Sequence, residues 1–308
     1  MGKSSKFIGI EIVLILFIIG CLYFSYFLNQ KISLQNKKYQ EESSLIVEKK
    51  RELAQEEKKI EVLEEAITKY QDIDSSIQKL KEQYFQSIKE LETKIMNGES
   101  TVKIAYLTFD DGPYYNTYNV LNILDQYNVK ATFFTISMNG EYCYDNKSAN
   151  CFLLYKEYVK RGHTIANHTY THGIRSGLYS SVNSFMDAIN RQEEHVKNQT
   201  EGYITNIVRF PGGSSTAKGL KPAMIEALQK KGYGWVDWNA GDGDGGRLDS
   251  TDQAWANLKS TINEKIEVIL FHDYSRITTS ILPEVITYLR DNGYQLYPLF
   301  YDSVMIHK

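Results

Sequence analysis

The sequence is short of several features that mark common protein classes. It has 308 residues and a formal net charge of only −3, so it lacks the positive excess of a general nucleic-acid-binding surface, and we predict no nucleic-acid partner. It contains three cysteines and three tryptophans, against 23 tyrosines. Between residues 30 and 97 it has no glycine and no proline, which excludes the usual helix breakers and favours one long helical segment.

The few cysteines fall in two places. Cys21 lies in an apolar run near the N-terminus, whereas Cys143 and Cys151 bracket a polar loop. If this loop lies outside the cytoplasm, the pair could form a disulfide. Two free thiols are the alternative, and the sequence leaves both open.

The run from Phe7 to Leu28 is apolar apart from Glu11. A membrane helix needs about 20 such residues, so we predict that residues 1–28 form an N-terminal anchor that crosses the membrane once, through residues 7–28. The segment IIGC at 18–21 resembles a lipoprotein cleavage box, but the apolar run continues past it to Leu28. Lysines flank the run on both sides, so charge alone does not set its orientation.

Residues 29–98 are predicted to form a helical coiled-coil stalk. Lysine and glutamate dominate, and apolar residues recur from Ile60 to Ile95 at a mean spacing of about 3.5, the period of a coiled coil. We therefore expect a homo-oligomer built through this segment. A single solvated or partly disordered charged segment is the alternative. Asn97 and Gly98 are typical of a helix end and place the domain boundary there.

From residue 99 to residue 308, strand-like and helix-like segments alternate about seven times. The expected strands are 103–109, 130–136, 163–166, 207–210, 234–237, 268–271 and 294–299, with amphipathic helices at 120–127, 152–160, 182–199, 222–231, 251–263 and 282–292. This alternation predicts an α/β domain of parallel strands joined by crossover helices. Seven or eight such units favour a barrel over an open sheet.

Charged and imidazole side chains recur at the ends of these strands or just after them. In a parallel α/β barrel the carboxyl ends of the strands share one face, where active sites form, so residues far apart in the sequence are expected to converge. The candidates are Asp110, Asp111, His168, His172, Arg209, Asp242 and His272.

The segment HTYTH at 168–172 points to a metal site. Two imidazoles four residues apart can reach one metal ion from a single helical turn. Two histidines and one carboxylate are a ligand set that leaves an open coordination position. Asp110 and Asp111 would point to opposite faces of a strand, so one of them could complete the metal site while the other acts as a base.

Four motifs in this order resemble those of the polysaccharide deacetylases, carbohydrate esterase family 4, whose domains are also called NodB-like. They are TFDDGP at 108–113, HTYTH at 168–172, RFPGG at 209–213 and ILFHD at 269–273. The resemblance covers about residues 103–298 and leaves out the anchor and the stalk. It implies a distorted (β/α) barrel and a metal-dependent hydrolase that removes acetyl groups from N-acetylated sugars by cleaving a linear amide bond.

The resemblance also implies roles for the catalytic residues that match the motifs. A divalent metal, with zinc first and cobalt, manganese or nickel as alternatives, would be bound by Asp111, His168 and His172. Asp110 would be the catalytic base and Arg209 would orient it. His272 would protonate the departing amine.

Three further matches concern the substrate. Leu270 would line the small pocket for the acetyl methyl group. Pro211 and Gly212 would bring a backbone N–H close to the oxyanion of the tetrahedral intermediate.

One motif departs from the family pattern. Where the family has Asp-x-x-Asp-Trp, this chain reads VDWNAGDGDGG at 236–246. The best alignment places Asn239 and Asp242 on the two acidic positions and Gly243 on the tryptophan. Asp242 would then tether one of two neighbours, Arg209 or His272. The missing tryptophan puts the substrate in doubt, and its place could be taken by Trp235, Trp238 or a nearby tyrosine.

The motif set favours a membrane-anchored enzyme that deacetylates cell-wall or surface polysaccharide, with the N-acetylglucosamine of peptidoglycan as the leading substrate. Such a glycan lies outside the membrane, so the C-terminal domain is expected to face outside. The alternative is a catalytically inactive glycan-binding or scaffolding module on a membrane stalk, which would not need the complete set of motif residues. His163, at the start of a strand, is expected to be structural.

Overall fold

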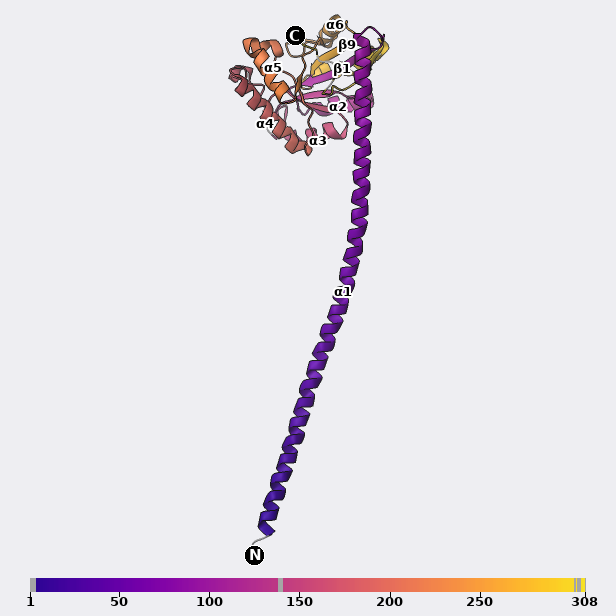
Figure 1. Cartoon of the computed structure of the whole chain (residues 1–308). Coiled ribbons are helices and arrows are strands. Elements are labelled where there is room, and N and C mark those ends of the chain that lie inside the picture. The colour runs from indigo at the N-terminus through magenta and orange to yellow at the C-terminus, as the bar shows by residue number, and fades with distance from the viewer. Residues whose placement is uncertain (1–3, 138–140, 302, 304–305, 308) are drawn as a thin grey trace. The chain divides into compact units, whose positions relative to one another are not determined.

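The computed structural model describes residues 4–137, 141–301, 303 and 306–307. The chain forms two compact units, residues 1–80 and residues 81–308. The first unit belongs to a single long helix, and the second is an α/β domain with its helices around a central sheet (Figure 1).

Helix α1 runs without a break from Ser4 to Met96, as the lack of proline and glycine after residue 29 predicts. The side chains of residues 4–13 lie outside the described residues, so the predicted span at 7–28 is described only from Leu14 onward. From Leu14 the helix is long and apolar enough to cross a membrane, by length and composition alone. Heptad residues such as Leu63 and Ile67 are 61% and 55% exposed, and the coiled coil that would cover them stays a prediction.

The last turns of α1 belong to the second unit, which begins at Lys81 and not at the boundary expected near residue 98. Ile88 and Ile95 are buried there, and the ring of Phe85 stacks on that of Phe300 at 4.9 Å. The buried carboxylate of Glu92 accepts a hydrogen bond from the hydroxyl of Tyr106. The apolar stripe at this end of the helix therefore packs on the α/β domain, which the spacing alone did not distinguish from a coiled-coil seam.

Among the described residues, the central sheet has eight strands, and all of the pairings between them are parallel. Seven strands follow the order β7-β6-β5-β2-β1-β9-β8, and the eighth, β10, pairs with the beginning of β1. Their bounds are β1 Lys103–Asp110, β2 Thr132–Thr135, β5 Thr164–Asn167, β6 Ile207–Val208, β7 Gly234–Trp235, β8 Ala240–Gly241, β9 Ile266–His272 and β10 Tyr294–Leu296. The expected strands are all present, and the two-residue β8 is an addition.

The sheet is curled but not closed. Strands β7 and β8 lie at its two edges, yet only residues 236–239 separate them in the chain. The five Cα–Cα steps from Trp235 to Ala240 reach at most about 18 Å, so the two edges must approach each other. No pairing joins β7 to β8 within the described residues. The predicted barrel is thus a half-barrel with a gap between these strands.

Alternation along β1 decides which side chains face the inside of the curl. Tyr106 packs in a cluster with residues of the neighbouring strands, including Phe134 and Val268, whereas Phe109 packs with residues of the surrounding helices. Since side chains alternate along a strand, Thr108 and Asp110 share the inner face with Tyr106. The carboxyl end of β1 therefore places the carboxylate of Asp110 at the mouth of the half-barrel.

Helices cover the outside of the sheet (Figure 1). They are α2 Thr117–Gln126, α3 Phe152–Lys160, α4 Val182–Thr200, α5 Lys221–Lys230, α6 Thr251–Thr261 and α7 Arg276–Asp291, with short 3₁₀ helices η1 Ile174–Ser176 and η2 Ser214–Leu220. Ser181, Ser250 and Ser275 cap α4, α6 and α7 by accepting a backbone N–H with their hydroxyl oxygens. The Ser275 cap starts α7 six residues before the predicted position, residue 282.

An antiparallel hairpin of β3 (Tyr142–Cys143) and β4 (Asn146–Asn150) interrupts the alternation between β2 and α3. Cys143 ends β3 and Cys151 follows β4 directly, and the two form a disulfide. Of the two alternatives left open by the sequence, the structure has the bridge.

Candidate active site

Asp110 and Asp111 lie side by side at the mouth of the half-barrel. Asp110 is the last residue of β1, and Asp111 has φ 69°, in the left-handed region that non-glycine residues seldom adopt. One carboxylate oxygen of each aspartate lies within 3.6 Å of His168 Nε2. The prediction that the two side chains diverge as on a regular strand is therefore wrong, because the chain turns at Asp111.

The HTYTH segment is a loop after β5, not the predicted helical turn. Thr169 and His172 have φ 66° and 51°, and the carboxamide oxygen of Asn167 accepts the N–H of Thr169. These left-handed residues fold the loop back, so the imidazole rings of His168 and His172 lie 5.0 Å apart. The four-residue spacing thus brings two imidazoles together through a tight loop.

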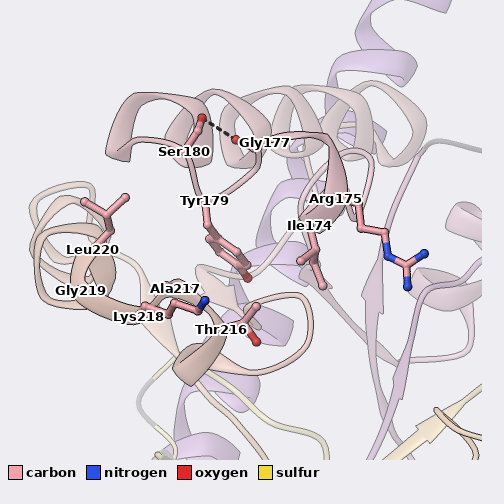
Figure 2. A pocket seen from close by; sticks show the side chains of 10 residues that line it. All are labelled: Ile174, Arg175, Gly177, Tyr179, Ser180, Thr216, Ala217, Lys218, Gly219 and Leu220. Carbon is pink, nitrogen blue, oxygen red and sulfur yellow. Dashed lines mark hydrogen bonds between the residues drawn. The ribbon is translucent and has the colours of Figure 1, made fainter.

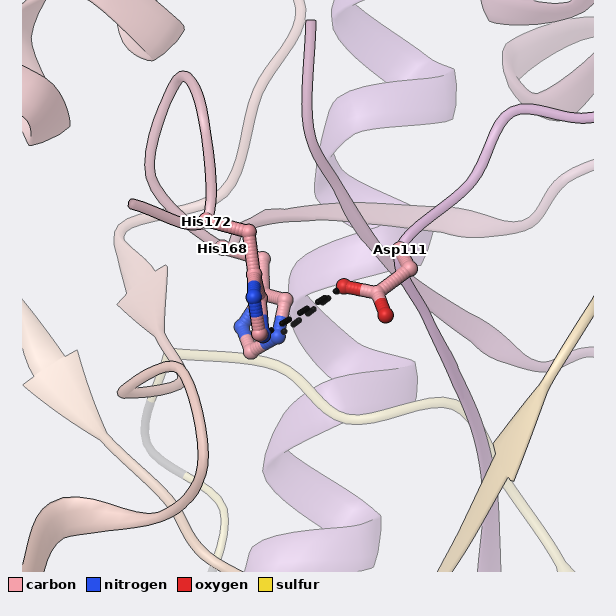
Figure 3. Close-up of side chains that lie close together, drawn as sticks. All are labelled: Asp111, His168 and His172. Carbon is pink, nitrogen blue, oxygen red and sulfur yellow. Dashed lines mark ion pairs between the residues drawn. The ribbon is translucent and has the colours of Figure 1, made fainter. Parts of the chain in front are cut away.

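Asp111, His168 and His172 form a cluster that suits a metal ion (Figure 3). Asp111 Oδ1 lies 3.5 Å from His168 Nε2 and 3.6 Å from His172 Nε2. This oxygen is buried and has no hydrogen-bond partner, which is costly unless a cation binds there. Two nitrogens and one carboxylate oxygen are a ligand set that zinc commonly takes.

Two features keep His168 ready to bind a metal. Its Nδ1–H donates to the backbone carbonyl of Arg209 at 2.9 Å, which leaves the Nε2 lone pair facing Asp111. Burial lowers the pKa of His168, although the nearby Asp110 and Asp111 oppose this shift. The ring is therefore held in the neutral form that a metal requires.

Arg209 is fully buried under the site, at the end of β6. Its guanidinium donates to Asp110 Oδ1 and to Thr108 Oγ1, each at 2.8 Å, and to the backbone carbonyl of Asp237 at 3.0 Å. The ring of Phe134 lies 4.1 Å from the guanidinium carbon. Asp110 is thus fixed in one orientation by a charged donor, as a positioned base requires.

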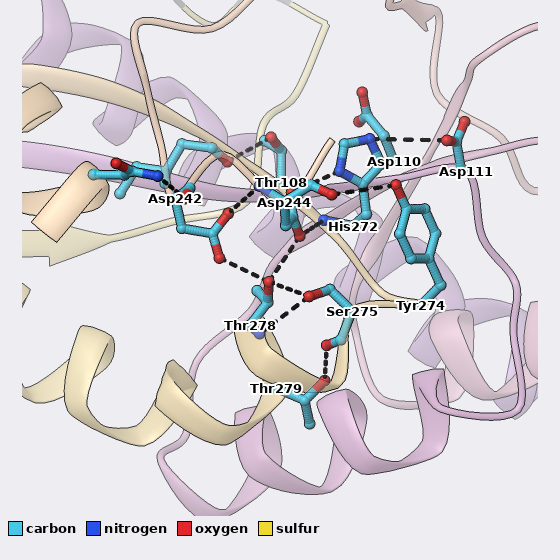
Figure 4. A network of polar contacts seen from close by, with 12 residues as sticks. Thr108, Asp110, Asp111, Asp242, Asp244, His272, Tyr274, Ser275, Thr278 and Thr279 are labelled. Atoms are coloured by element: carbon cyan, nitrogen blue, oxygen red, sulfur yellow. Dashed lines mark hydrogen bonds and ion pairs between the residues drawn. The ribbon is translucent and has the colours of Figure 1, made fainter. Parts of the chain in front are cut away.

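His272 faces the same site from the end of β9 (Figure 4). Its Nδ1–H donates to Asp244 Oδ1 at 2.7 Å, and its Nε2 lies 3.8 Å from Asp111 Oδ2. Burial lowers the pKa of His272, but the hydrogen bond and charge of Asp244, with Asp110 and Asp111, outweigh it and raise the pKa to about 9. At neutral pH this imidazole can therefore give up a proton at Nε2.

Asp242 was predicted to tether Arg209 or His272, but the carboxylate that holds His272 is that of Asp244, and the guanidinium of Arg209 donates to Thr108, Asp110 and the backbone carbonyl of Asp237. Asp244 Oδ2 also accepts the backbone N–H of His272, at 2.7 Å. The carboxylate of Asp242 instead accepts the hydroxyl of Thr278 at 2.7 Å and the N–H of Asp244 at 3.1 Å. The run GDGDGG offers two aspartates two residues apart, and the alignment to the family pattern selected Asp242, the one that does not contact His272.

The position that corresponds to the family's tryptophan also changes, because the tryptophan follows the second acidic residue of the pattern. With Asp244 as the tether, the next residue is Gly245, where an added Cβ would lie 3.0 Å from His272 Cε1. Trp235 packs 3.6 Å from the ring of His307, and Trp238 lies under Gly213, so neither takes that position. The ring of Tyr274 lies 5.0 Å from that of His272.

The three residues predicted to contact the substrate, Leu270, Pro211 and Gly212, lie on β9 and just after β6. Leu270 is half-buried on β9, two residues before His272. Gly212 is exposed with φ 72°, and an added Cβ would lie 3.1 Å from the side chain of Ile174, two residues after His172. The carbonyl of Pro211 accepts the hydroxyl of Tyr179 at 2.8 Å, which holds this turn in place.

A pocket of about 660 Å³ adjoins the loop that carries His172 (Figure 2). It lies between η1 with its following turn and η2, and Arg175, Tyr179 and Lys218 are among its lining residues. The pocket stands on the loops that follow β5 and β6, and in the strand order these two strands lie on the opposite side of β1 from β9.

Comparison with known proteins agrees with this geometry. A family model for polysaccharide deacetylases matches residues 97–234. YheN of Bacillus subtilis, named as a polysaccharide deacetylase, is 33% identical over 240 residues, which are 72% of this chain and 74% of YheN. A peptidoglycan-N-acetylglucosamine deacetylase of Bacillus cereus is 26% identical over 92% of this chain and 90% of its own length.

A solved structure is also similar. It is the catalytic domain of a peptidoglycan N-acetylglucosamine deacetylase from Eubacterium rectale, with 34% identity and a TM-score of 0.61. The match covers 67% of this chain and 93% of that domain.

Proposed function

Since this chain belongs to the polysaccharide deacetylase family, we propose that it is a metal-dependent hydrolase that removes N-acetyl groups from amino-sugar residues of cell-wall polysaccharide. The N-acetylglucosamine of peptidoglycan is the leading substrate, because two similar proteins are named for that activity. The observation that carries the proposal is the cluster of Asp110, Asp111, His168 and His172 at one mouth of the half-barrel.

The reaction adds water across the amide bond and yields acetate and a free amine. A divalent ion held by Asp111, His168 and His172 would polarise the amide carbonyl. Zinc is the first candidate, and cobalt, manganese or nickel are alternatives that the same nitrogen and oxygen donors accept.

The side chains then divide the proton transfers between them. Asp110, oriented by Arg209, takes a proton from the attacking water. His272, held through Nδ1 by Asp244, gives a proton at Nε2 to the departing nitrogen, which otherwise could not leave as an amine. A backbone N–H near Pro211 and Gly212 would face the oxyanion, and Leu270 would contact the acetyl methyl group.

The location follows from the substrate. We propose that residues 7–28 anchor the chain in the cell membrane and that the C-terminal domain faces outside, where the glycan lies. The disulfide between Cys143 and Cys151 supports this placement, because disulfides persist in oxidising compartments. Alkylation of intact cells with a membrane-impermeant reagent, with and without a reductant, tests it. Free thiols shielded from the reagent would contradict an outward-facing domain.

The stalk is proposed to associate with other copies of the chain through its exposed heptad residues. This oligomer would hold several deacetylase domains on one patch of membrane.

Acetate release tests the function directly. The full chain, purified in detergent and loaded with zinc, should release acetate from N-acetylated peptidoglycan, and chelation should stop it. The alternative, an inactive glycan-binding module, predicts retention on the same glycan with no acetate released whatever metal is supplied.

A further inference from the structure

A row of tyrosine rings leads from the active site to the disulfide-closed hairpin. The ring of Tyr274 lies 5.0 Å from His272, that of Tyr114 lies 5.4 Å from Tyr274, and that of Tyr144 lies 6.4 Å from Tyr114. Tyr144 is 68% exposed and Tyr274 36% exposed. We call Tyr114, Tyr144 and Tyr274 the tyrosine row. Tyr114, between the other two, is half-buried. A contiguous apolar patch at the surface is typical of a binding site.

The hairpin is fixed to the loop that carries the two catalytic aspartates. The carboxylate of Asp145 accepts the backbone N–H groups of Tyr115 and Asn116, at 2.7 and 3.0 Å. The carboxamide of Asn116 in turn donates to the backbone carbonyl of Asp273 at 2.8 Å. The disulfide joins Cys143, the residue directly before Tyr144, to Cys151, the residue directly after β4. Tyr144 is therefore held at a set distance from the reacting centre.

The tyrosine row also lies beside the position where the family's tryptophan is replaced by glycine. Gly245 puts no side chain beside His272, and Tyr274 is the ring that contacts it (Figure 4). The hydroxyl of Tyr274 donates to the backbone carbonyl of Asp244 at 3.5 Å, which orients the ring. Adjacent rings in the row meet edge to face, at 69° and 81°, so they are not stacked on one another and a ligand can lie against them.

We propose that the tyrosine row is a subsite for the glycan chain, binding a pyranose ring that flanks the sugar being deacetylated. This inference rests on the proposed function. The row is continuous with His272, and a pyranose offers an apolar C–H face to an aromatic ring and hydroxyls to its polar rim. Lys147 lies 5.3 Å from the Tyr144 ring and adds a hydrogen-bond donor at the outer end.

The order of the strands is compatible with a linear glycan that crosses the predicted metal site. The row stands on the loops after β1 and β9 and on the hairpin after β2, whereas the 660 Å³ pocket stands on the loops after β5 and β6. A linear glycan with one end at the pocket and the other on the row would present a middle sugar to Asp110 and His272. An enzyme with this arrangement prefers polymers over single sugars.

The test compares Tyr144→Ala with Tyr142→Ala, which removes an exposed ring (56%) from the same hairpin outside the row. The full chain is assayed for acetate release from a β-1,4-linked N-acetylglucosamine tetramer and from the monosaccharide. Aromatic contacts of this size correspond to a change of about three- to ten-fold in binding. Tyr144→Ala should raise KM for the tetramer by that factor, leave kcat and the monosaccharide unchanged, and be rescued by Tyr144→Trp.

Calorimetric binding of the tetramer, measured in parallel, separates this inference from the function it rests on. If Tyr144→Ala binds the tetramer more weakly but neither the parent nor any variant releases acetate, the deacetylase activity is refuted and the glycan subsite at the tyrosine row is supported. If acetate is released and Tyr144→Ala and Tyr142→Ala have the same KM and affinity for the tetramer, the subsite at the tyrosine row is refuted and the deacetylase activity is supported. A parent that neither binds the tetramer nor releases acetate would overturn both.

Discussion

Asp244→Asn should disable the proton donor without disturbing the metal cluster. Asp244 makes two 2.7 Å hydrogen bonds to His272, one to the ring Nδ1–H and one to the backbone N–H. An asparagine of the same shape has one acceptor and no charge, so it loses the charge-assisted bond to the ring. Hydrogen bonds to charged groups contribute about 1.5–3 kcal/mol, and a tenfold change in rate is about 1.4 kcal/mol. We therefore expect kcat for deacetylation to fall by about 10- to 100-fold.

Asp242→Asn is the matched control, because Asp242 lies two residues away and is also buried. Burial and the charge of Asp244 raise the pKa of Asp242, so neutralising this carboxyl should cost little. Acetate release, zinc content by elemental analysis and thermal melting are measured for both variants. Equal losses of kcat in the two variants, or a larger loss in Asp242→Asn, would refute the assignment of Asp244 as the tether of His272.

Three further predictions concern the metal, the pH dependence and the stalk. His172→Ala removes one of three ligands, so we expect it to lose most of the bound zinc, and elemental analysis showing parent-level zinc would contradict the cluster. Burial lowers the pKa of His163 to about 3 in the folded state, against about 6.5 in the unfolded state. As the pH falls below about 6.5, the unfolded state therefore binds a proton at this residue that the folded state does not bind, and the protein loses stability. Between pH 6.5 and about 3, the free energy of unfolding of the parent should fall by up to about 1.4 kcal/mol per pH unit more than that of His163→Gln. Urea denaturation at several pH values measures both. The same pH dependence in the parent and the variant would contradict the prediction. A peptide of residues 30–80 should be helical and self-associate in circular dichroism and sedimentation, and a concentration-independent coil spectrum would count against the stalk.

The main strands and helices were predictable because each has its own hydrophobic pattern. Helix α3 was expected at 152–160 and spans Phe152–Lys160, and β1 was expected at 103–109 and spans Lys103–Asp110. Strand β8 has only two residues, which pair with Ile269 and Leu270 of β9. Such a short strand is defined by its neighbour and leaves no period of its own in the sequence.

The members of the site were predictable from their places after the strands, but their geometry was not. Sequence position alone could not show that Asp111 and His172 adopt left-handed conformations, which bring their side chains to His168. The choice of Asp244 over Asp242 depends on how the segment after β8 lies against β9, a tertiary contact. The last turns of α1 show the same limit, because one apolar stripe suits either a partner helix or the α/β domain.

The most direct test of the deacetylase assignment is the Asp110→Asn variant of the zinc-loaded full chain on N-acetylated peptidoglycan. Removing a general base alone typically costs about 10²–10⁴-fold. We predict that the variant keeps one zinc per chain and the parent's melting temperature, and that its acetate release falls by at least 100-fold. Acetate release near the parent's rate, with zinc retained, would show that Asp110 is only a turn residue and would contradict the proposed chemistry.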